Sequence, residues 1–149
     1  MIKLQTITEE NFDDVIGLSV KSNQEHFMRS NVYSLAQCYL YREANDVFPF
    51  AILKDELVVG FVLLYSDEED TEPSMTIWRM MIGKDYQQRG YGKKAMHEII
   101  QWVQSFQKYN LLYITHHPEN LGAHKLYDSL GFKEIGMNDH HEILMQFEL

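Results

Sequence analysis

The clearest chemical signal in the sequence is a glycine-containing loop. Residues Gln87 to Gly92 have the spacing Q-x-x-G-x-G and lie between a β-rich run and a stretch of helical periodicity. Glycines let backbone N–H groups turn toward an anion without obstruction by a Cβ atom, and the first turn of a following helix adds unpaired N–H groups and the positive end of a dipole. The loop therefore predicts a binding site for a pyrophosphate. Four bases lie within eleven residues here: Lys84, Arg89, Lys93 and Lys94.

The same loop also satisfies the dinucleotide fingerprint G-x-G-x-x-A, from Gly90 to Ala95. In that fingerprint the first glycine follows its strand closely, whereas seven residues separate Ile82 from Gly90. An acid is also expected about 20 residues later, for a ribose hydroxyl. No Asp or Glu occurs from Ile99 to Pro118. We therefore favour the pyrophosphate of another cofactor, and two incidental glycines at a helix start are the remaining alternative.

The histidines invite a metal-binding interpretation. Five of the seven occur at 116–117, 124 and 140–141, but the sequence contains no H-E-x-x-H motif and no Cys/His ligand spacing. We predict no metal site and expect ordinary surface or core histidines. Cys38 is the single cysteine, so it has no partner for an internal disulfide and is expected to be a small buried residue.

Local patterns predict the elements that position the loop. Residues 2–5 alternate as a strand does, and Thr8 can cap a first helix. Ser34 to Gln37 resembles a capping box, which predicts the start of a second helix. The stretch between these helices, residues 21–33, is ambiguous. Three β-rich runs then predict an antiparallel meander. They cover residues 48–53, 57–66 and 75–82.

The second half of the chain continues with alternating helices and strands. Apolar residues recur at helical spacing after the glycines, and residues 111–115 form a short apolar run, so this strand should lie parallel to the one before the loop. Asn120 can cap a further helix that ends near Gly131. Residues 133–136 and 142–149 predict a final hairpin. The predicted fold class is mixed α/β (α+β), with about seven mostly antiparallel strands and flanking helices.

The composition fits one globular domain. The chain has 149 residues, of which 45% are hydrophobic, and no linker divides it, so we predict a single domain over residues 1–149. The formal net charge of -9 disfavours nucleic acid as a main partner and fits a cationic partner better. No signal-peptide pattern or membrane-spanning run occurs, so a cytoplasmic location without membrane contact is the default expectation. The sequence is silent on oligomeric state and is compatible with a homodimer.

Two separated motifs resemble the GCN5-related N-acetyltransferase (GNAT) family. The first is the loop, preceded by Met80-Met81-Ile82, and the second has the form N-x-x-A-x-x-x-Y-x-x-x-G-F from Asn120 to Phe132. The resemblance extends over nearly the whole chain. It implies an N-acetyltransferase that uses acetyl-CoA, and a sheet in which the parallel strand pair is splayed. Gly83-Lys84 departs from the family, many of whose members have a proline there.

The resemblance also implies which residues bind the cofactor. In the family, exposed backbone of the strand binds the pantetheine arm, the loop amides hold the pyrophosphate, and the later Asn and Tyr face the arm and the thioester. By resemblance, these roles fall on Met80, Met81, Ile82, Gln87, Gln88, Arg89, Gly90, Tyr91, Gly92, Lys93, Asn120 and Tyr127.

Tyr127 is the candidate catalytic residue. Direct attack of an amine on the thioester expels a thiolate, and a phenol with a pKa near 10 can donate a hydrogen bond or a proton to it. A purely structural tyrosine in the apolar stripe of its helix is the alternative. The sequence does not identify the general base. Candidates for this role or for contact with the acceptor are Glu25, His26, Asp67 and His116.

The acceptor amine is predicted from charge and from a finer resemblance. Residues 22–30 and the layout of the N-terminal half are similar to bacterial spermine/spermidine acetyltransferases within the family. The acidic segment from Asp67 to Glu72 could lie at the edge of an acceptor groove and attract a polyamine, although such segments commonly serve only solubility. A peptide N-terminus, another small amine, and a non-catalytic acyl-CoA-sensing module remain alternatives.

Overall fold

The sheet of the protein is mixed and mostly antiparallel. The structure is a computed structural model that describes residues 1–69 and 71–149, and in these residues seven strands form one sheet in the order β1-β2-β3-β4-β5-β7-β6. The strands are β1 (Ile2–Thr6), β2 (Val47–Lys54), β3 (Leu57–Asp67), β4 (Ser74–Ile82), β5 (Leu111–His116), β6 (Lys133–Met137) and β7 (Ile143–Glu148). Among these strands, β4 and β5 pair in parallel and the other neighbouring pairs are antiparallel. The structure thus confirms the predicted fold class.

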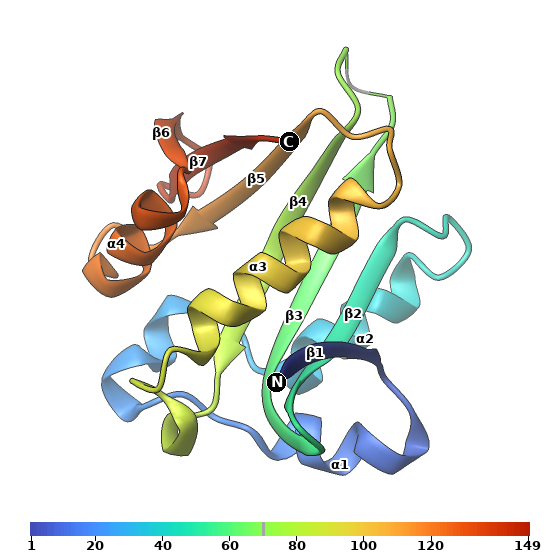
Figure 1. Cartoon of the computed structure of the whole chain (residues 1–149), viewed down its shortest axis with the longest axis vertical. Helices are drawn as coiled ribbons and strands as arrows, with labels where there is room; N and C mark the ends of the chain where they lie inside the picture. The colour runs from blue at the N-terminus through green and yellow to red at the C-terminus, as the bar shows by residue number, and fades with distance from the viewer. Residues whose placement is uncertain (70) are drawn as a thin grey trace.

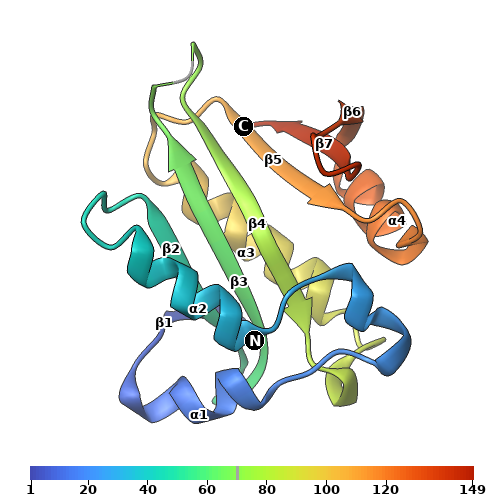
Figure 2. The same cartoon turned by 180° about the vertical axis from the view of Figure 1, so that it is seen from behind.

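Helices cover both faces of the sheet. They are α1 (Glu9–Gly17), α2 (Asn31–Leu40), α3 (Tyr91–Gln104) and α4 (Leu121–Leu130), with the short 3-10 helices η1 (Ser22–Phe27) and η2 (Lys84–Tyr86). The long helix α3 crosses one face (Figure 1), and α1 and α2 lie on the other face (Figure 2). No helix among the described residues is both long and apolar enough to span a bilayer.

Two apolar clusters fill the space between these layers. One contains Met96 and Ile99 of α3 and Tyr127 of α4, packed against the sheet. The other contains Val15 of α1 and sheet residues, with the half-buried Cys38 of α2 packed against them. Each cluster is removed from water by the helices on its own face, so the burial of apolar area stabilises both layers.

The second helix begins earlier than the sequence predicted. Ser30 is its N-cap, because Ser30 Oγ accepts a hydrogen bond of 3.2 Å from the Tyr33 N–H, and α2 starts at Asn31. The prediction of a start at Ser34 was wrong. Ser34 is buried inside the helix, and its Oγ accepts a hydrogen bond of 3.1 Å from Arg79 Nη1. Serine is an equally good N-cap residue at both positions, and the helix begins at the upstream one, Ser30, and not at Ser34.

Strands β4 and β5 separate partway along their length. Ser74–Ile77 of β4 pairs with Leu111–Ile114 of β5, whereas residues 78–82 of β4 have no partner in β5. On its other side β4 stays paired with β3 as far as Ile82. One edge of residues 78–82 therefore presents backbone groups that no strand of the sheet takes up. The pair is splayed, as the resemblance implied.

Candidate active site

The loop before α3 presents an open helix N-terminus. Gly90 is the N-cap and has a left-handed backbone with φ 79°, and Gln88 also has a positive φ of 62°. The first intrahelical bond of α3 runs from the Lys94 N–H to the Gly90 carbonyl, at 3.2 Å. No side chain caps the helix. The N–H groups of residues 91–93 thus lack intrahelical acceptors and can bind an anion.

A cleft of about 450 Å³ runs from this helix end along the free edge of β4. Its walls come from the loop, from β4, from α4 and from η1. The residues that line it are Val20, Lys21, Gln24, Phe27, Met28, Met80, Met81, Ile82, Tyr86, Gln87, Gln88, Gly90, Tyr91, Gly92, Lys93, Asn120, Gly122, Ala123, Leu126 and Tyr127. The cleft therefore joins the free strand edge to the helix N-terminus.

The cleft brings together nearly all the residues predicted to bind the cofactor. Arg89 is the exception, because it does not line the cleft and its Nη2 donates a 3.3 Å hydrogen bond to the Asp85 carbonyl. Gln87 lines the cleft and also ties the loop in place. Its Nε2 donates to the Ile82 carbonyl at 3.0 Å and to Gln24 Oε1 at 2.9 Å. In the opposite direction, Gln24 Nε2 donates a 3.2 Å hydrogen bond to Gln87 Oε1, so the two side chains hold η1 and the loop together.

A second pocket, of about 670 Å³, lies where β4 and β5 diverge, on the side of α2 and η1. It shares Phe27, Met28, Met80, Asn120 and Tyr127 with the cleft, so the two cavities meet at these residues. Its other lining residues are Glu25, His26, Arg29, Tyr33, Gln37, Ile77, Trp78, Arg79, Ile114, Thr115, His116, His117, His140 and Glu142. A molecule in the cleft and a second molecule in this pocket could therefore react at the junction.

Tyr127 stands at the junction of the cavities. Only 7% of the residue is exposed, and burial raises the pKa of its hydroxyl to about 12. Its ring lies 6.2 Å from that of His116 and 6.0 Å from that of Phe132, measured between centroids. The phenol is therefore neutral at physiological pH and can donate a hydrogen bond to a group in either cavity.

His116 lines the second pocket, but both of its ring nitrogens are engaged. Its Nδ1 lies 2.8 Å from the His117 carbonyl, which can only accept, so Nδ1 carries the hydrogen. Its Nε2 lies 3.0 Å from His124 Nδ1. Direct proton abstraction by His116 would require release of His124. No local pattern in the sequence predicts this pair, because His116 belongs to β5 and His124 belongs to α4.

The other candidates for contact with the acceptor fall in two places. Glu25 and His26 line the second pocket, whereas Asp67 lines neither cavity. Asp67 ends β3, at the end of the sheet opposite the loop before α3 (Figure 1). The described residues of the segment from Asp67 to Glu72 line neither cavity, so a place for this segment at the edge of an acceptor groove stays a prediction. Asp70, which belongs to this segment, lies outside the described residues.

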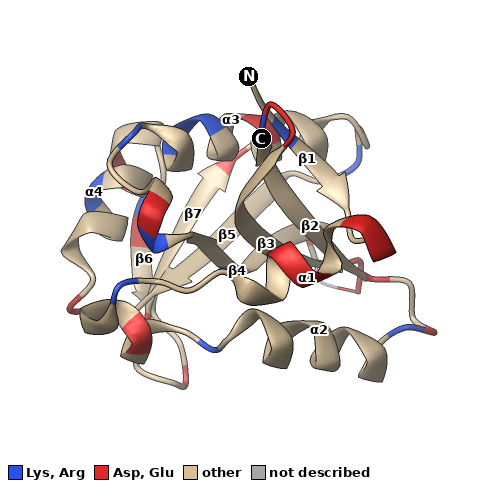
Figure 3. Cartoon of the chain, turned by 90° about the horizontal axis from the view of Figure 1, so that it is seen from below, with Lys and Arg blue, Asp and Glu red and all other residues tan. Residues whose placement is uncertain are grey.

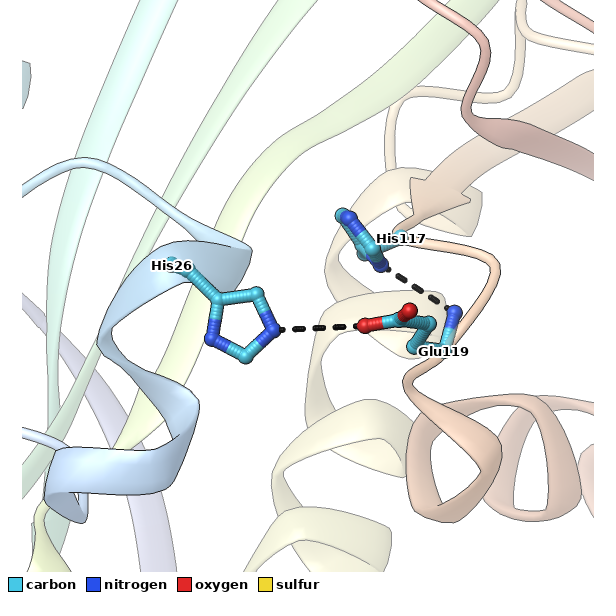
Figure 4. Close-up of side chains that lie close together, drawn as sticks. All are labelled: His26, His117 and Glu119. Carbon is cyan, nitrogen blue, oxygen red and sulfur yellow. Dashed lines mark hydrogen bonds and ion pairs between the residues drawn. The ribbon is translucent and has the colours of Figure 1, made fainter.

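Three side chains lie close together, and two of them, His26 and His117, line the second pocket (Figure 4). The ligand atoms of His26, His117 and Glu119 are within 4.8 Å of one another. His26 Nε2 is 3.6 Å from Glu119 Oε2, and the Glu119 N–H donates a 3.1 Å hydrogen bond to His117 Nδ1. Because His26 and Glu119 are exposed and one nitrogen of His117 is already engaged, we assign no metal to this group.

Comparisons with known proteins agree with this arrangement. The acetyltransferase (GNAT) family model matches residues 12–132. The chain is 26% identical to the spermine/spermidine N(1)-acetyltransferase of Bacillus subtilis, over 93% of this chain and 91% of the relative. It is 27% identical to the N-acetylaspartate synthetase of Xenopus tropicalis, over 82% of this chain and 43% of the relative. A solved aminoglycoside acetyltransferase in complex with coenzyme A has a TM-score of 0.81, 16% identity, and coverage of 99% and 95%.

Proposed function

Because the chain belongs to the acetyltransferase (GNAT) family, we propose that it transfers an acetyl group from acetyl-CoA to a primary amine. The observation that carries this proposal is the meeting of two cavities at Tyr127. One cavity ends at an open helix N-terminus, which suits a pyrophosphate, and the other is lined by ionisable side chains, which suits a polar amine. We also propose that residues 1–149 act as one catalytic domain.

The cleft supports a specific placement of acetyl-CoA. The pyrophosphate would accept hydrogen bonds from the N–H groups at the start of α3, next to Gly92. The pantetheine arm would lie along residues 78–82, whose free edge offers backbone partners. The thioester would then reach the junction beside Asn120 and Tyr127. In this placement Gln87 and Gln24 hold the loop rather than the cofactor, because they bond to each other.

The reaction would be a direct attack of the amine on the thioester carbon. The amine must first lose a proton, and because an aliphatic ammonium has a pKa near 10, this costs roughly 4 kcal/mol at neutral pH. The tetrahedral intermediate then expels the thiolate of CoA. Tyr127 would donate a hydrogen bond to that sulfur. Its raised pKa, about 12, keeps the phenol protonated and favours donation of a hydrogen bond over complete loss of the proton.

The pH dependence should reflect the amine and not the tyrosine. Because the pKa of Tyr127 is raised to about 12, its proton is present throughout the range from about pH 6 to about pH 9. We expect kcat/KM to rise with pH over this range as the acceptor ammonium deprotonates, without a descending limb. Initial rates in overlapping buffers measure this. A descending limb near pH 8 that disappears in Tyr127→Phe would assign the tyrosine a much lower pKa and contradict the account.

For the acceptor, we propose a polyamine such as spermine or spermidine as the first candidate. The named Bacillus relative and the net charge of -9 support it. The acidic residues are spread over several separate elements, α1 among them (Figure 3). A polyamine would therefore be attracted by the net charge of the whole protein and not by one acidic face. A peptide N-terminus or another small amine is the alternative within the same activity, and an acyl-CoA-sensing module is the alternative without catalysis.

Release of free thiol from acetyl-CoA tests the activity. We expect thiol release to depend on an added amine, in a panel of polyamines, amino acids, aminoglycosides and short peptides. Tight binding of acetyl-CoA without thiol release from any amine would support the sensing module instead.

A polyamine acceptor should show a salt dependence. Salt screens exposed charges over a Debye length of about 8 Å at physiological ionic strength. We therefore expect kcat/KM for spermine to exceed that for a monoamine of similar length and to fall as salt is added. Glu69→Gln serves as a control, because Glu69 follows β3 at the far end of the sheet and should leave KM for spermine unchanged. Equal turnover of spermine and the monoamine, without salt dependence, would refute the proposal of a polyamine acceptor.

A further inference from the structure

Arg79 places a positive charge in the second pocket without a carboxylate partner. Its Nη1 donates a 3.1 Å hydrogen bond to Ser34 Oγ and another to Gln37 Oε1, and both acceptors are neutral. None of the ion pairs among residues 1–69 and 71–149 involves Arg79. Fully buried charges in proteins are usually paired with an opposite charge. The guanidinium of Arg79 is half-buried, forms no ion pair with the described residues and lines a cavity.

The surroundings of Arg79 hold it in place, and Glu142 of the same pocket attracts its charge without forming an ion pair with it. Its guanidinium carbon lies 4.7 Å from the centre of the Trp78 ring and 5.4 Å from that of Tyr33. Burial lowers the pKa of Arg79, although an arginine stays charged in proteins. Of its donors, those on Nη2 and Nε make no hydrogen bond within the described residues. A fixed guanidinium with free N–H groups is suited to the two oxygens of a carboxylate.

The other charges of the pocket are of both signs. Arg29 also lines it, with its guanidinium 4.7 Å from the centre of the Tyr33 ring. Glu25 and Glu142 supply two negative charges. A cavity built only for a polycation would be expected to collect acids and avoid arginines, because like charges repel. This mixture fits a molecule that carries both an ammonium and a carboxylate.

We infer that the acceptor carries a carboxylate besides the amine that is acetylated, and that Arg79 binds this carboxylate. The acceptor class would then be an amino acid or a close derivative, in place of the polyamine that the named relative and the net charge suggest. Arg79 and Met80 line the same pocket, and Met80 also lines the cleft, so a molecule bound in the pocket can lie between Arg79 and the junction of the two cavities. Glu25 lines the same pocket and can attract the ammonium of the acceptor. The inference rests on the proposed acetyl transfer and names its substrate class.

Matched pairs of acceptors test the carboxylate directly. Lysine and cadaverine differ in one carboxylate, as do ornithine and putrescine, and neither diamine retains a carboxylate. We expect kcat/KM of the parent protein to favour the carboxylate-rich member of the fastest pair about tenfold or more, the size of a charge-assisted hydrogen bond. This comparison needs no variant. A preference for the decarboxylated member, or no preference in any pair that turns over, would overturn the inference.

A variant then assigns the preference to one residue. In Arg79→Gln, we expect the preferred acceptor to lose about tenfold or more in kcat/KM, while its decarboxylated partner changes little. Arg79→Lys should recover part of the loss. Arg42→Gln is the matched control, since Arg42 also lies over a tyrosine ring, that of Tyr39, but lines neither cavity. An equal loss for both members of the pair in Arg79→Gln would make Arg79 structural and overturn its role.

The outcomes separate this inference from the proposed function. Thiol release with polyamines but with no preference for a carboxylate refutes the inference and leaves the acetyltransferase standing. No thiol release with any amine refutes both.

Discussion

Tyr127→Phe is expected to lower kcat about a hundredfold or more, which is the usual size of a contribution from general acid catalysis or its hydrogen-bonding equivalent. The substitution removes the hydroxyl at the junction of the two cavities and keeps the ring that packs near Phe132. KM for acetyl-CoA should change little, because the hydrogen bond to sulfur forms as the thiolate leaves. Steady-state kinetics with saturating amine measure both parameters.

The control for Tyr127→Phe is Tyr109→Phe. Tyr109 and Tyr127 are each 7% exposed, and both belong to the same apolar cluster, but Tyr109 lines neither cavity. Tyr109→Phe should therefore retain kcat. If Tyr127→Phe retains kcat within a factor of about two of the parent at every pH, then Tyr127 has a packing role and no catalytic one.

Gly92→Val is expected to weaken the binding of acetyl-CoA roughly tenfold to a hundredfold, since one hydrogen bond to a charged group is worth about 1.5 to 3 kcal/mol. A Cβ atom at Gly92 would lie 3.5 Å from Leu126 Cδ2 and 3.9 Å from Ile82 Cγ1, which are ordinary contacts. The free protein should therefore fold. The added side chain would stand in the cleft, where the pyrophosphate must approach the backbone. Calorimetric titration with acetyl-CoA measures the loss.

Gly90→Val is a less direct test of the same loop. Gly90 has φ 79°, a conformation that side chains with a Cβ atom rarely adopt, so the substitution strains the loop as well as blocking it. Gly17→Val is the control, because a Cβ atom at Gly17 meets nothing within 4 Å and Gly17 does not line the cleft. Unchanged affinity in a folded Gly92→Val protein would refute the placement of the pyrophosphate at this loop.

Local sequence patterns were sufficient for most of the fold. Thr8 caps α1, as predicted, because its Oγ1 accepts a hydrogen bond from the Asn11 N–H. Asn120 caps α4 in the same way through the Ala123 N–H, and Gly131 ends that helix in a left-handed conformation. In each case the deciding contact is made within a few residues, so a short window of sequence contains it. The meander was predictable for the same reason.

The features that were missed depend on contacts between distant segments. Arg79 is the charged residue of β4, which is a signal that it needs a partner, but its hydrogen-bond partners come from α2. The bond to Ser34 spans 45 positions, and no periodicity predicts it. Likewise, His116 and His124 meet only because β5 and α4 are packed together. The composition determines the net charge but not where the charged residues lie in the fold. The two arginines of the second pocket were therefore not predicted.

The account is tested most directly by following acetyl transfer itself. The protein is incubated with acetyl-CoA and a single amine, and free CoA thiol and N-acetylated amine are quantified in the same sample by absorbance and mass spectrometry. Our account predicts equal amounts of the two products, formed only when the amine is present and much more slowly in Tyr127→Phe. Bound acetyl-CoA that yields neither product with polyamines, amino acids or peptides would contradict it.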